Sequence, residues 1–241
     1  MKLIINADDF GLSKSISDGI IKGIKDGYIT STSVMANMKY AEYAIKNALE
    51  NNISCIGLHI NFTKGKPIIP NPNLTDNNGV FLGRTSQIEN IKLTYEDAYN
   101  EIKAQIDIID KYSNGKLKID HLDAHHFVSL NINIRNAIID IAKEYNIPIR
   151  NEFECDILKP EIFYMDFSLK NIDYKELENM LSLYKDKDTS VELLTHPGFV
   201  DDYTMNITSH NIQREQELNI LRKAKDNGLF DQVELISFKQ L

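Results

Sequence analysis

The segment LIINADDFG, residues 3–11, carries the pattern that decides the fold. Leu3 to Ala7 form an apolar run of strand length, and two aspartates follow at its end. Isoleucines then recur at helical spacing from Ile16 to Ile24, and Gly27 ends that stretch. A strand followed directly by a helix is the repeating unit of parallel α/β sheets.

The same alternation continues along the whole chain. Further strands are predicted at residues 31–36, 53–60, 117–122, 147–150, 191–194 and 233–236, and further helices at 40–49, 95–112, 134–145, 174–184 and 212–226. About seven repeats predict a single α/β domain over residues 1–241, built as a distorted (β/α) barrel of about seven parallel strands. A doubly wound open sheet is the alternative.

Two segments interrupt this alternation. Residues 63–87 contain three prolines and three glycines with few periodic apolar residues, and residues 151–171 contain Pro160 and several aromatic residues. Loops of this length in a compact domain are usually functional or disordered. Because both follow predicted strands, both are expected on the face where the strands end.

Composition excludes several classes of function. The 241 residues include 27 Lys and Arg against 35 Asp and Glu, a net charge of −8, with no basic block. Binding to nucleic acid or to an anionic membrane through overall charge is therefore not expected. No run of about 18 apolar residues predicts a membrane span. The first apolar run reaches Asp8 too early for a signal peptide, which predicts a cytoplasmic protein with Cys55 and Cys155 as reduced thiols.

Unusual polar residues gather at the predicted strand ends. Ligands bind and chemistry occurs at the carboxyl ends of parallel strands. Five of the six histidines lie in these segments, and the sixth, His210, lies in a polar loop. The strand-end residues are Asp8, Asp9, His59, His121, Asp123, His125, His126, Arg150 and His196.

Aspartate and histidine without cysteine suit a divalent metal such as zinc, or a harder ion with water in the remaining positions. A nearby carboxylate could accept a proton from water, and a further histidine could protonate a leaving group. Each residue alone also has a structural explanation, such as a turn, a helix cap or a core histidine. Their collection on one face favours a site. A metal-dependent phosphoesterase is a competing interpretation, but the strand ends offer mainly Arg150 for a phosphate.

Five segments identify the family that this sequence resembles. They are NADDFGLS (6–13), TSTSVMAN (30–37), IGLHINFTKGKP (56–67), HLDAHHF (121–127) and THPGFVD (195–201). Together they resemble the YdjC-like carbohydrate deacetylases, also called chitooligosaccharide deacetylases. The resemblance implies a distorted barrel related to the polysaccharide deacetylases, one divalent metal ion (magnesium or zinc), and hydrolysis of the N-acetyl group of an amino sugar or short oligosaccharide.

The resemblance also implies roles for individual residues. Asp9, His59 and His125 are expected to bind the metal. Asp8 is expected to act as the base that activates water, and His196 as the acid that protonates the departing amine. Supporting or substrate-binding roles are expected for His121, Asp123, His126, Arg150 and Asp201. Independently of the resemblance, a negative Asp201 would raise the pKa of His196 if the two residues were close, and the sequence does not show whether they touch.

Some expectations stay open at this stage. Many relatives have three consecutive histidines where this chain has His125, His126 and Phe127, so substrate contacts near Phe127 are in doubt. The 63–87 loop is a candidate lid or sugar-binding rim. The aromatic residues of 153–167 are expected either to stack on a sugar or to form a local core. A carbohydrate-binding relative without catalysis is the second alternative, and a homodimer is the expected assembly.

Overall fold

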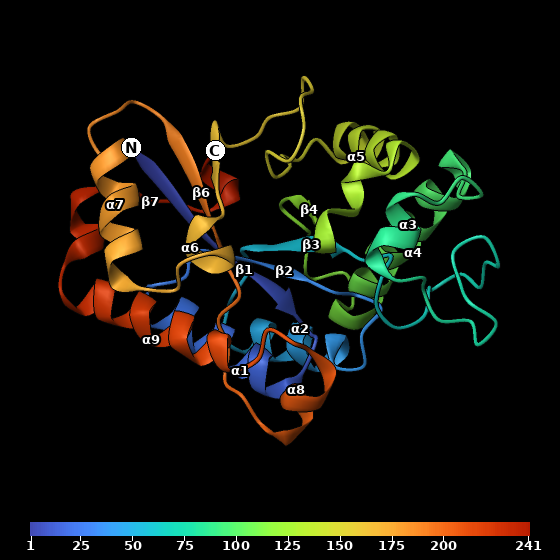
Figure 1. Ribbon diagram of the computed structural model, residues 1–241, viewed down its shortest axis with the longest axis horizontal. Helices are drawn as coiled ribbons and strands as arrows, with labels where there is room; N and C mark the ends of the chain where they lie inside the picture. Colours follow the sequence, from blue (N-terminus) through green and yellow to red (C-terminus); the bar gives the residue numbers. More distant parts are fainter.

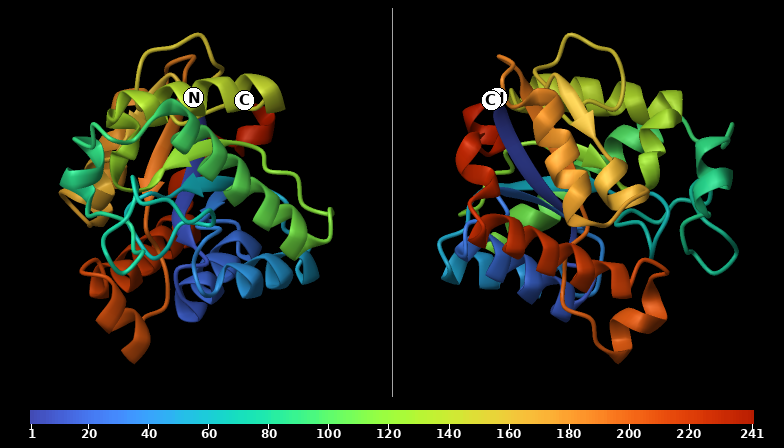
Figure 2. Two further views of the ribbon diagram at one scale, coloured as in Figure 1. Left: turned by 90° about the vertical axis from the view of Figure 1, so that its right-hand side faces the viewer. Right: turned by 60° about the vertical axis from the view of Figure 1, so that its left-hand side comes forward.

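The computed structural model describes residues 1–241 and shows one curled parallel sheet with helices around its outer face (Figure 1). The strands are β1 (Lys2–Phe10), β2 (Ser31–Val34), β3 (Ile56–Ile60), β4 (Leu122–Ala124), β5 (Ile162–Tyr164), β6 (Ser190–Thr195) and β7 (Glu234–Leu235). The two chain ends lie close together (Figure 2). No helix is both long and apolar enough to span a membrane.

The strand order distinguishes the barrel from the open sheet. The order is β4-β3-β2-β1-β6-β5, with β7 paired to the start of β1, and every pairing is parallel. Strand β6 pairs with the edge of β1 that β2 leaves free. The strands therefore follow one another around the sheet in chain order, as in a barrel, and the sheet curls. The sheet stays open between β4 and β5. The expected distorted (β/α) barrel is therefore confirmed.

The helices cover the outside of this sheet (Figures 1 and 2). Apolar side chains between helices and sheet form one main cluster of 50 buried residues. Ser13 and Thr94 start two of the helices by accepting hydrogen bonds from backbone N–H groups of the first turn. The helices are α1 (Lys14–Lys25), α2 (Ala41–Glu50), α3 (Arg84–Ile88), α4 (Tyr95–Ser113), α5 (Ile132–Tyr145), α6 (Asp166–Leu169), α7 (Tyr174–Tyr184), α8 (Asp202–Ile207) and α9 (Ile212–Asp226), with 3₁₀ helices η1 (His125–Leu130), η2 (Leu229–Gln232) and η3 (Phe238–Gln240).

Two strand predictions were wrong. The predicted strand at 147–150 contributes only an isolated bridge between Ile149 and Leu122, because Pro148 has no N–H to extend the pairing. The fifth strand is instead β5, inside the predicted 151–171 loop. The predicted strand at 117–122 pairs as a strand only from Leu122, so Asp123 lies within β4 and does not follow it. That residues 1–241 form a single domain stays a prediction.

Candidate active site

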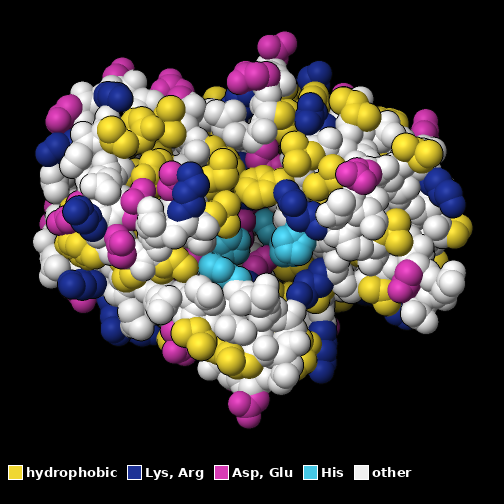
Figure 3. Space-filling model, viewed as in Figure 1, with side chains coloured by type: hydrophobic (Ala, Val, Ile, Leu, Met, Phe, Trp, Pro, Cys, Tyr) yellow, Lys and Arg dark blue, Asp and Glu magenta, His cyan; other side chains and the backbone are white.

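A cavity of about 250 Å³ opens where the strands end. Figure 3 shows histidine side chains gathered in a central hollow, with acidic atoms beneath them. The cavity is lined by residues from distant parts of the chain, among them Asp8, Asp9, His59, Lys64, Arg84, His125, His126, Phe127, Arg150, His196, His210 and Arg214. The structure thus brings the predicted catalytic and metal-binding residues together at one end of the sheet.

A bulge in β1 places two consecutive carboxylates on the same side. The pairing of β1 with β2 shifts register between Ala7 and Phe10. Asp9 has φ 68°, in the left-handed region that aspartate tolerates better than most residues. Without this bulge, consecutive strand residues would point to opposite faces. Asp8 and Asp9 can therefore both line the cavity although the strand continues to Phe10.

Three atoms that could bind a metal form a triangle at the base of the cavity. The Oδ1 of Asp9 lies 3.1 Å from Nδ1 of His125 and 3.5 Å from Nε2 of His59, and the two nitrogens are 3.2 Å apart. Metal–ligand distances of about 2.0–2.2 Å place neighbouring ligands on one ion about 3.0–3.5 Å apart. All three residues are buried, and Oδ1 of Asp9 has no hydrogen-bond partner. The triangle fits a divalent ion.

A carboxylate behind His59 fixes its orientation. Asp123 Oδ1 accepts a hydrogen bond from Nδ1 of His59 at 2.8 Å, which leaves Nε2 free to bind a metal. Asp123 in turn accepts a hydrogen bond from Ser33 Oγ at 2.8 Å. Burial alone would lower the pKa of His59, but Asp123 and Asp8 raise it well above the ordinary value. The negative charge that favours a proton at Nε2 also favours a metal cation there.

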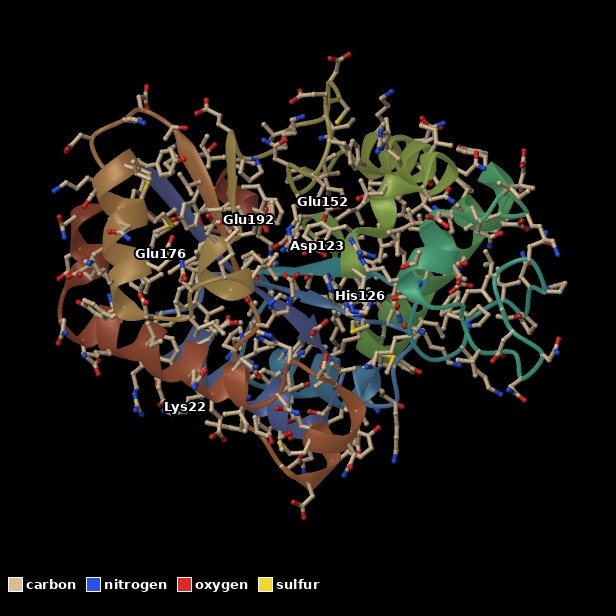
Figure 4. The ribbon with its side chains drawn as sticks, viewed as in Figure 1. Lys22, Asp123, His126, Glu152, Glu176 and Glu192 are labelled. Atoms are coloured by element: carbon tan, nitrogen blue, oxygen red, sulfur yellow. The ribbon has the colours of Figure 1, made fainter.

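His125 is suited to bind a metal as a neutral imidazole. Burial lowers its pKa, and the opposing effect of Asp9 does not restore it. His126 stacks on His125 with ring centroids 3.8 Å apart. Both His126 and Phe127 have left-handed backbones, with φ 57° and 55°. The left-handed backbone after β4 allows both His125 and His126 to line the cavity. Figure 4 shows His126 next to α3.

Arg150, which lies beside β4, holds the predicted base. Its Nη1 and Nη2 donate to the two oxygens of Asp8 at 2.8 and 2.6 Å. Nη2 also lies 3.0 Å from Asp123, and Nε donates to Glu192 at 2.8 Å. Asp123 and Glu192 lie near one another at the centre of the curled sheet (Figure 4). Burial would lower the pKa of Arg150, but these carboxylates raise it further above its ordinary value, so the guanidinium stays charged.

Arg214 of α9 performs a similar function for Asp9. Its Nη2 donates to Oδ2 of Asp9 at 2.5 Å. Burial alone would raise the pKa of Asp9, but the charges of Arg214 and His125 hold it well below the usual range. One carboxylate oxygen is thus anchored by Arg214, and the other, Oδ1, faces the two histidines.

His196 is held by a serine and a glutamate. Ser168 Oγ donates to Oε1 of Glu217 at 2.6 Å, so its oxygen accepts from Nδ1 of His196 at 2.7 Å. The backbone N–H of His196 also donates to Glu217. This arrangement leaves Nε2 as the free nitrogen. Burial lowers the pKa of His196, while Asp8, Asp9 and Glu217 act in the opposite direction.

Two predicted supporting roles do not match the geometry. Asp201 caps α8 by accepting from the backbone N–H of Thr204, so the carboxylate bonded to His196 is Glu217 instead. His121 lies below the site, with Nδ1 bonded to Asp120 at 2.6 Å and its ring stacked on Phe238. It makes no hydrogen bond to His59 or His125.

Several residues that line or support the site were not predicted as site residues. Arg214 and Glu217 lie on the buried stripe of α9, together with Leu218 and Leu221. Charged residues at the positions of an apolar helical stripe are the signal that could have identified them. Ser168 and His210 carry no comparable signal, because both lie in short or irregular segments. These residues include Arg84, Ser168, Glu192, His210, Arg214 and Glu217.

Comparisons with known proteins agree with this geometry. A profile of YdjC-like proteins matches residues 2–226. A carbohydrate deacetylase of Clostridium beijerinckii is 34% identical to this chain, over 100% of both chains. A solved structure from Enterococcus faecalis, described as a candidate cellobiose-phosphate cleavage protein, superposes with a TM-score of 0.89 at 29% identity, over 99% of this chain and 98% of that one.

A more distant structure supports the fold alone. A peptidoglycan N-acetylglucosamine deacetylase superposes with a TM-score of 0.52 at 12% identity, covering 98% of this chain and 85% of that chain. The profile match spans most of the chain, and the curated relative is similar over its full length. The chain therefore belongs to the YdjC-like family, a family of enzymes that includes carbohydrate deacetylases.

Proposed function

We propose that this enzyme removes the N-acetyl group from an amino sugar or a short chitooligosaccharide and releases acetate. The observation that carries the proposal is the triangle of Asp9, His59 and His125 beside a separately held carboxylate and a separately held histidine. Family membership supports the reaction class. Hydrolysis of an amide requires activation of water, stabilisation of an oxyanion and protonation of the departing nitrogen.

Asp9, His59 and His125 would hold one divalent ion. When bound, such an ion polarises a carbonyl and lowers the pKa of water. Two imidazoles and one carboxylate favour zinc by ligand softness, whereas magnesium prefers oxygen ligands. Zinc is therefore the first metal to test, with magnesium second. Arg214 keeps the Asp9 carboxylate charged and oriented for this role.

Asp8 is the proposed base. Arg150 holds both of its oxygens, so the carboxylate cannot rotate away from the cavity. Asp8 accepts a proton from the attacking water, whose oxygen bonds to the acetamide carbon. The nearest distance between Asp8 and Nε2 of His59 is 3.8 Å, which places the base beside the proposed metal ligands.

His196 is the proposed acid. Its Nδ1 is engaged by Ser168, so the proton for the sugar nitrogen comes from Nε2. As the C–N bond breaks, this proton converts the leaving group into a free amine, and the acetyl group leaves as acetate. Glu217 stabilises the charged imidazolium through Ser168 and offsets part of the effect of burial.

Two cations of the cavity favour a phosphorylated sugar among the possible substrates. Arg150 and Arg214 are occupied by Asp8 and Asp9, whereas Lys64 and Arg84 form no ion pair with a carboxylate. Each donates only to a carbonyl oxygen, of Ile207 and His126 respectively. Free cations at the cavity suit a phosphate group on the substrate. The name of the Enterococcus structure points to the same chemistry.

The test is acetate release from metal-stripped protein after adding back zinc, magnesium, cobalt or no metal. The substrates are N-acetylglucosamine, N,N′-diacetylchitobiose and the phosphorylated form of the disaccharide. Metal-dependent acetate release is expected, with the phosphorylated disaccharide preferred. A folded, metal-loaded protein that released no acetate but hydrolysed phosphate esters would contradict the proposal and support the phosphoesterase interpretation.

A further inference from the structure

His210 lies in the cavity but has no part in the proposed reaction. It precedes α9, and its Nε2 donates to Oε1 of Glu217 at 3.0 Å. Its ring centroid is 5.1 Å from that of His196. The side chain is 27% exposed, whereas the Glu217 side chain is fully buried. An ion could therefore reach this cluster from the cavity side.

The cluster has donor atoms at the spacing of metal ligands. His196, His210 and Glu217 each offer one atom, and these three atoms lie within 4.8 Å of one another. None of the three belongs to the triangle of Asp9, His59 and His125. Ser168 Oγ lies 2.7 Å from Nδ1 of His196 and 2.6 Å from Oε1 of Glu217, so a fourth oxygen is adjacent.

The surroundings of Glu217 are compatible with a bound cation. This carboxylate is 0% exposed, and it forms no ion pair with a lysine or arginine. Its three hydrogen-bond donors are a backbone N–H, a serine hydroxyl and an imidazole. A divalent ion could take the place that Arg150 and Arg214 hold beside Asp8 and Asp9 in the same cavity, because Glu217 lies beside two imidazoles and has no guanidinium or ammonium partner.

We infer that His196, His210 and Glu217 form a second divalent-cation site that takes zinc. Two imidazoles and one carboxylate are a common zinc ligand set. On binding, Nδ1 of His196 and Nε2 of His210 would become metal ligands: in a neutral ring the proton moves to the other ring nitrogen, and an imidazolium releases one proton to solvent. The hydrogen bonds of these nitrogens to Ser168 and Glu217 would be replaced by bonds to the ion.

The consequence for activity rests on the proposed function. An ion bound to Nδ1 of His196 replaces the proton that makes the ring a cationic acid. The imidazole then cannot deliver a proton to the sugar amine with the same ease. The first equivalent of zinc activates the enzyme, and the second equivalent inhibits it.

Zinc counting by native mass spectrometry tests the site without relying on activity. Metal-free protein is equilibrated with about four equivalents of zinc and transferred to a volatile buffer. Wild type is expected to hold two zinc ions, H210A and H125A one each, and the double variant none. H126A is the matched control, because His126 lines the same cavity outside both ligand sets, and it is expected to hold two.

A wild-type protein that holds one zinc ion, or an H210A protein that still holds two, would overturn the inference. H210Q provides a second variant in case H210A melts at a lower temperature than wild type. Each protein is then loaded with one equivalent of zinc, and its rate of acetate release is measured as more zinc is added. The rates are expressed as fractions of that protein's highest rate. H210A is expected to need at least tenfold more zinc for half inhibition.

The two proposals fail separately in this design. Two bound zinc ions with undiminished acetate release would contradict the inhibitory effect and leave the metal site established. Absence of acetate release from every metal-loaded form would contradict the proposed function, and the zinc counts would still decide the second site.

Discussion

Arg150 donates to both carboxylate oxygens of Asp8, at 2.8 and 2.6 Å, and the two residues are 142 positions apart in the chain. The guanidinium also contacts Asp123 and Glu192, so one buried cation holds three carboxylates. Positioning of the proposed base therefore depends on a residue contributed from beside β4.

Replacing Arg150 with lysine is expected to lower kcat by about 100-fold or more, because an ammonium cannot donate to both oxygens in one plane. Loss of the guanidinium also leaves the buried carboxylates around Arg150 with fewer ion pairs, so the unfolding temperature is expected to fall. Steady-state kinetics and a thermal melt measure both effects. Unchanged kcat in R150K would show that Asp8 needs no fixed orientation.

Asp8→Asn is expected to lower kcat by about 10³-fold or more, because the amide cannot accept the proton of the attacking water. Zinc content should stay at the wild-type value, since Asp8 lies outside the ligand triangle. Elemental analysis of the same protein sample checks this. Retention of most activity would contradict the assignment of Asp8 as the base.

Ser168→Ala is expected to lower kcat about 10-fold or more with little change in KM. Loss of the hydroxyl removes the hydrogen-bonded link between the His196 imidazole and Glu217, so the charged imidazolium loses stabilisation and the pKa of His196 falls further. The alkaline limb of the pH–kcat profile should move to lower pH. Ser168→Thr, which keeps the hydroxyl, is the control and should restore the wild-type profile.

Stability should fall as pH rises from about 4.5 to 7. Burial raises the pKa of Glu152 from 4.5 to about 7, so in this range the folded protein holds a proton that the unfolded chain releases. The stabilisation is complete below pH 4.5 and is lost by pH 7, with a magnitude on the order of 3 kcal/mol. Urea unfolding at several pH values gives the free energy of unfolding, which should depend less on pH in E152Q than in wild type. The control is E154Q, whose side chain is 99% exposed.

Arg84→Gln is expected to raise KM for a phosphorylated disaccharide about tenfold and to leave KM for N,N′-diacetylchitobiose within about twofold. The reason is that the guanidinium has no carboxylate partner and is free to bind a phosphate. The ratio of the two KM values is the measurement. An equal effect on both substrates would indicate a structural role for Arg84.

The sequence predicted the curled α/β fold and the residues that gather in the cavity, because both depend on local patterns. Strand–helix periodicity predicts parallel strands, and polar residues such as His59 and His196 stand at their ends. Their chemical roles stay proposals.

Other parts of the site depend on contacts between residues far apart in the chain, which local sequence patterns do not predict. Glu217 reaches His196 across 21 positions, and Arg214 reaches Asp9 across 205. Strand β5 was missed because it has only three residues, all of them half-buried. The sequence also left open whether Asp201 contacts His196, and in the structure Asp201 accepts from the N-terminus of α8.

The left-handed backbone at Asp9 limits how this position can change during evolution. Most side chains are strained at φ 68°, whereas glycine and asparagine are accommodated. Descendants of this protein that lose the acidic ligand but keep the barrel should therefore carry asparagine or glycine at position 9. Valine or isoleucine there would damage the fold together with the site, so such lineages would be lost and not persist as folded, inactive relatives.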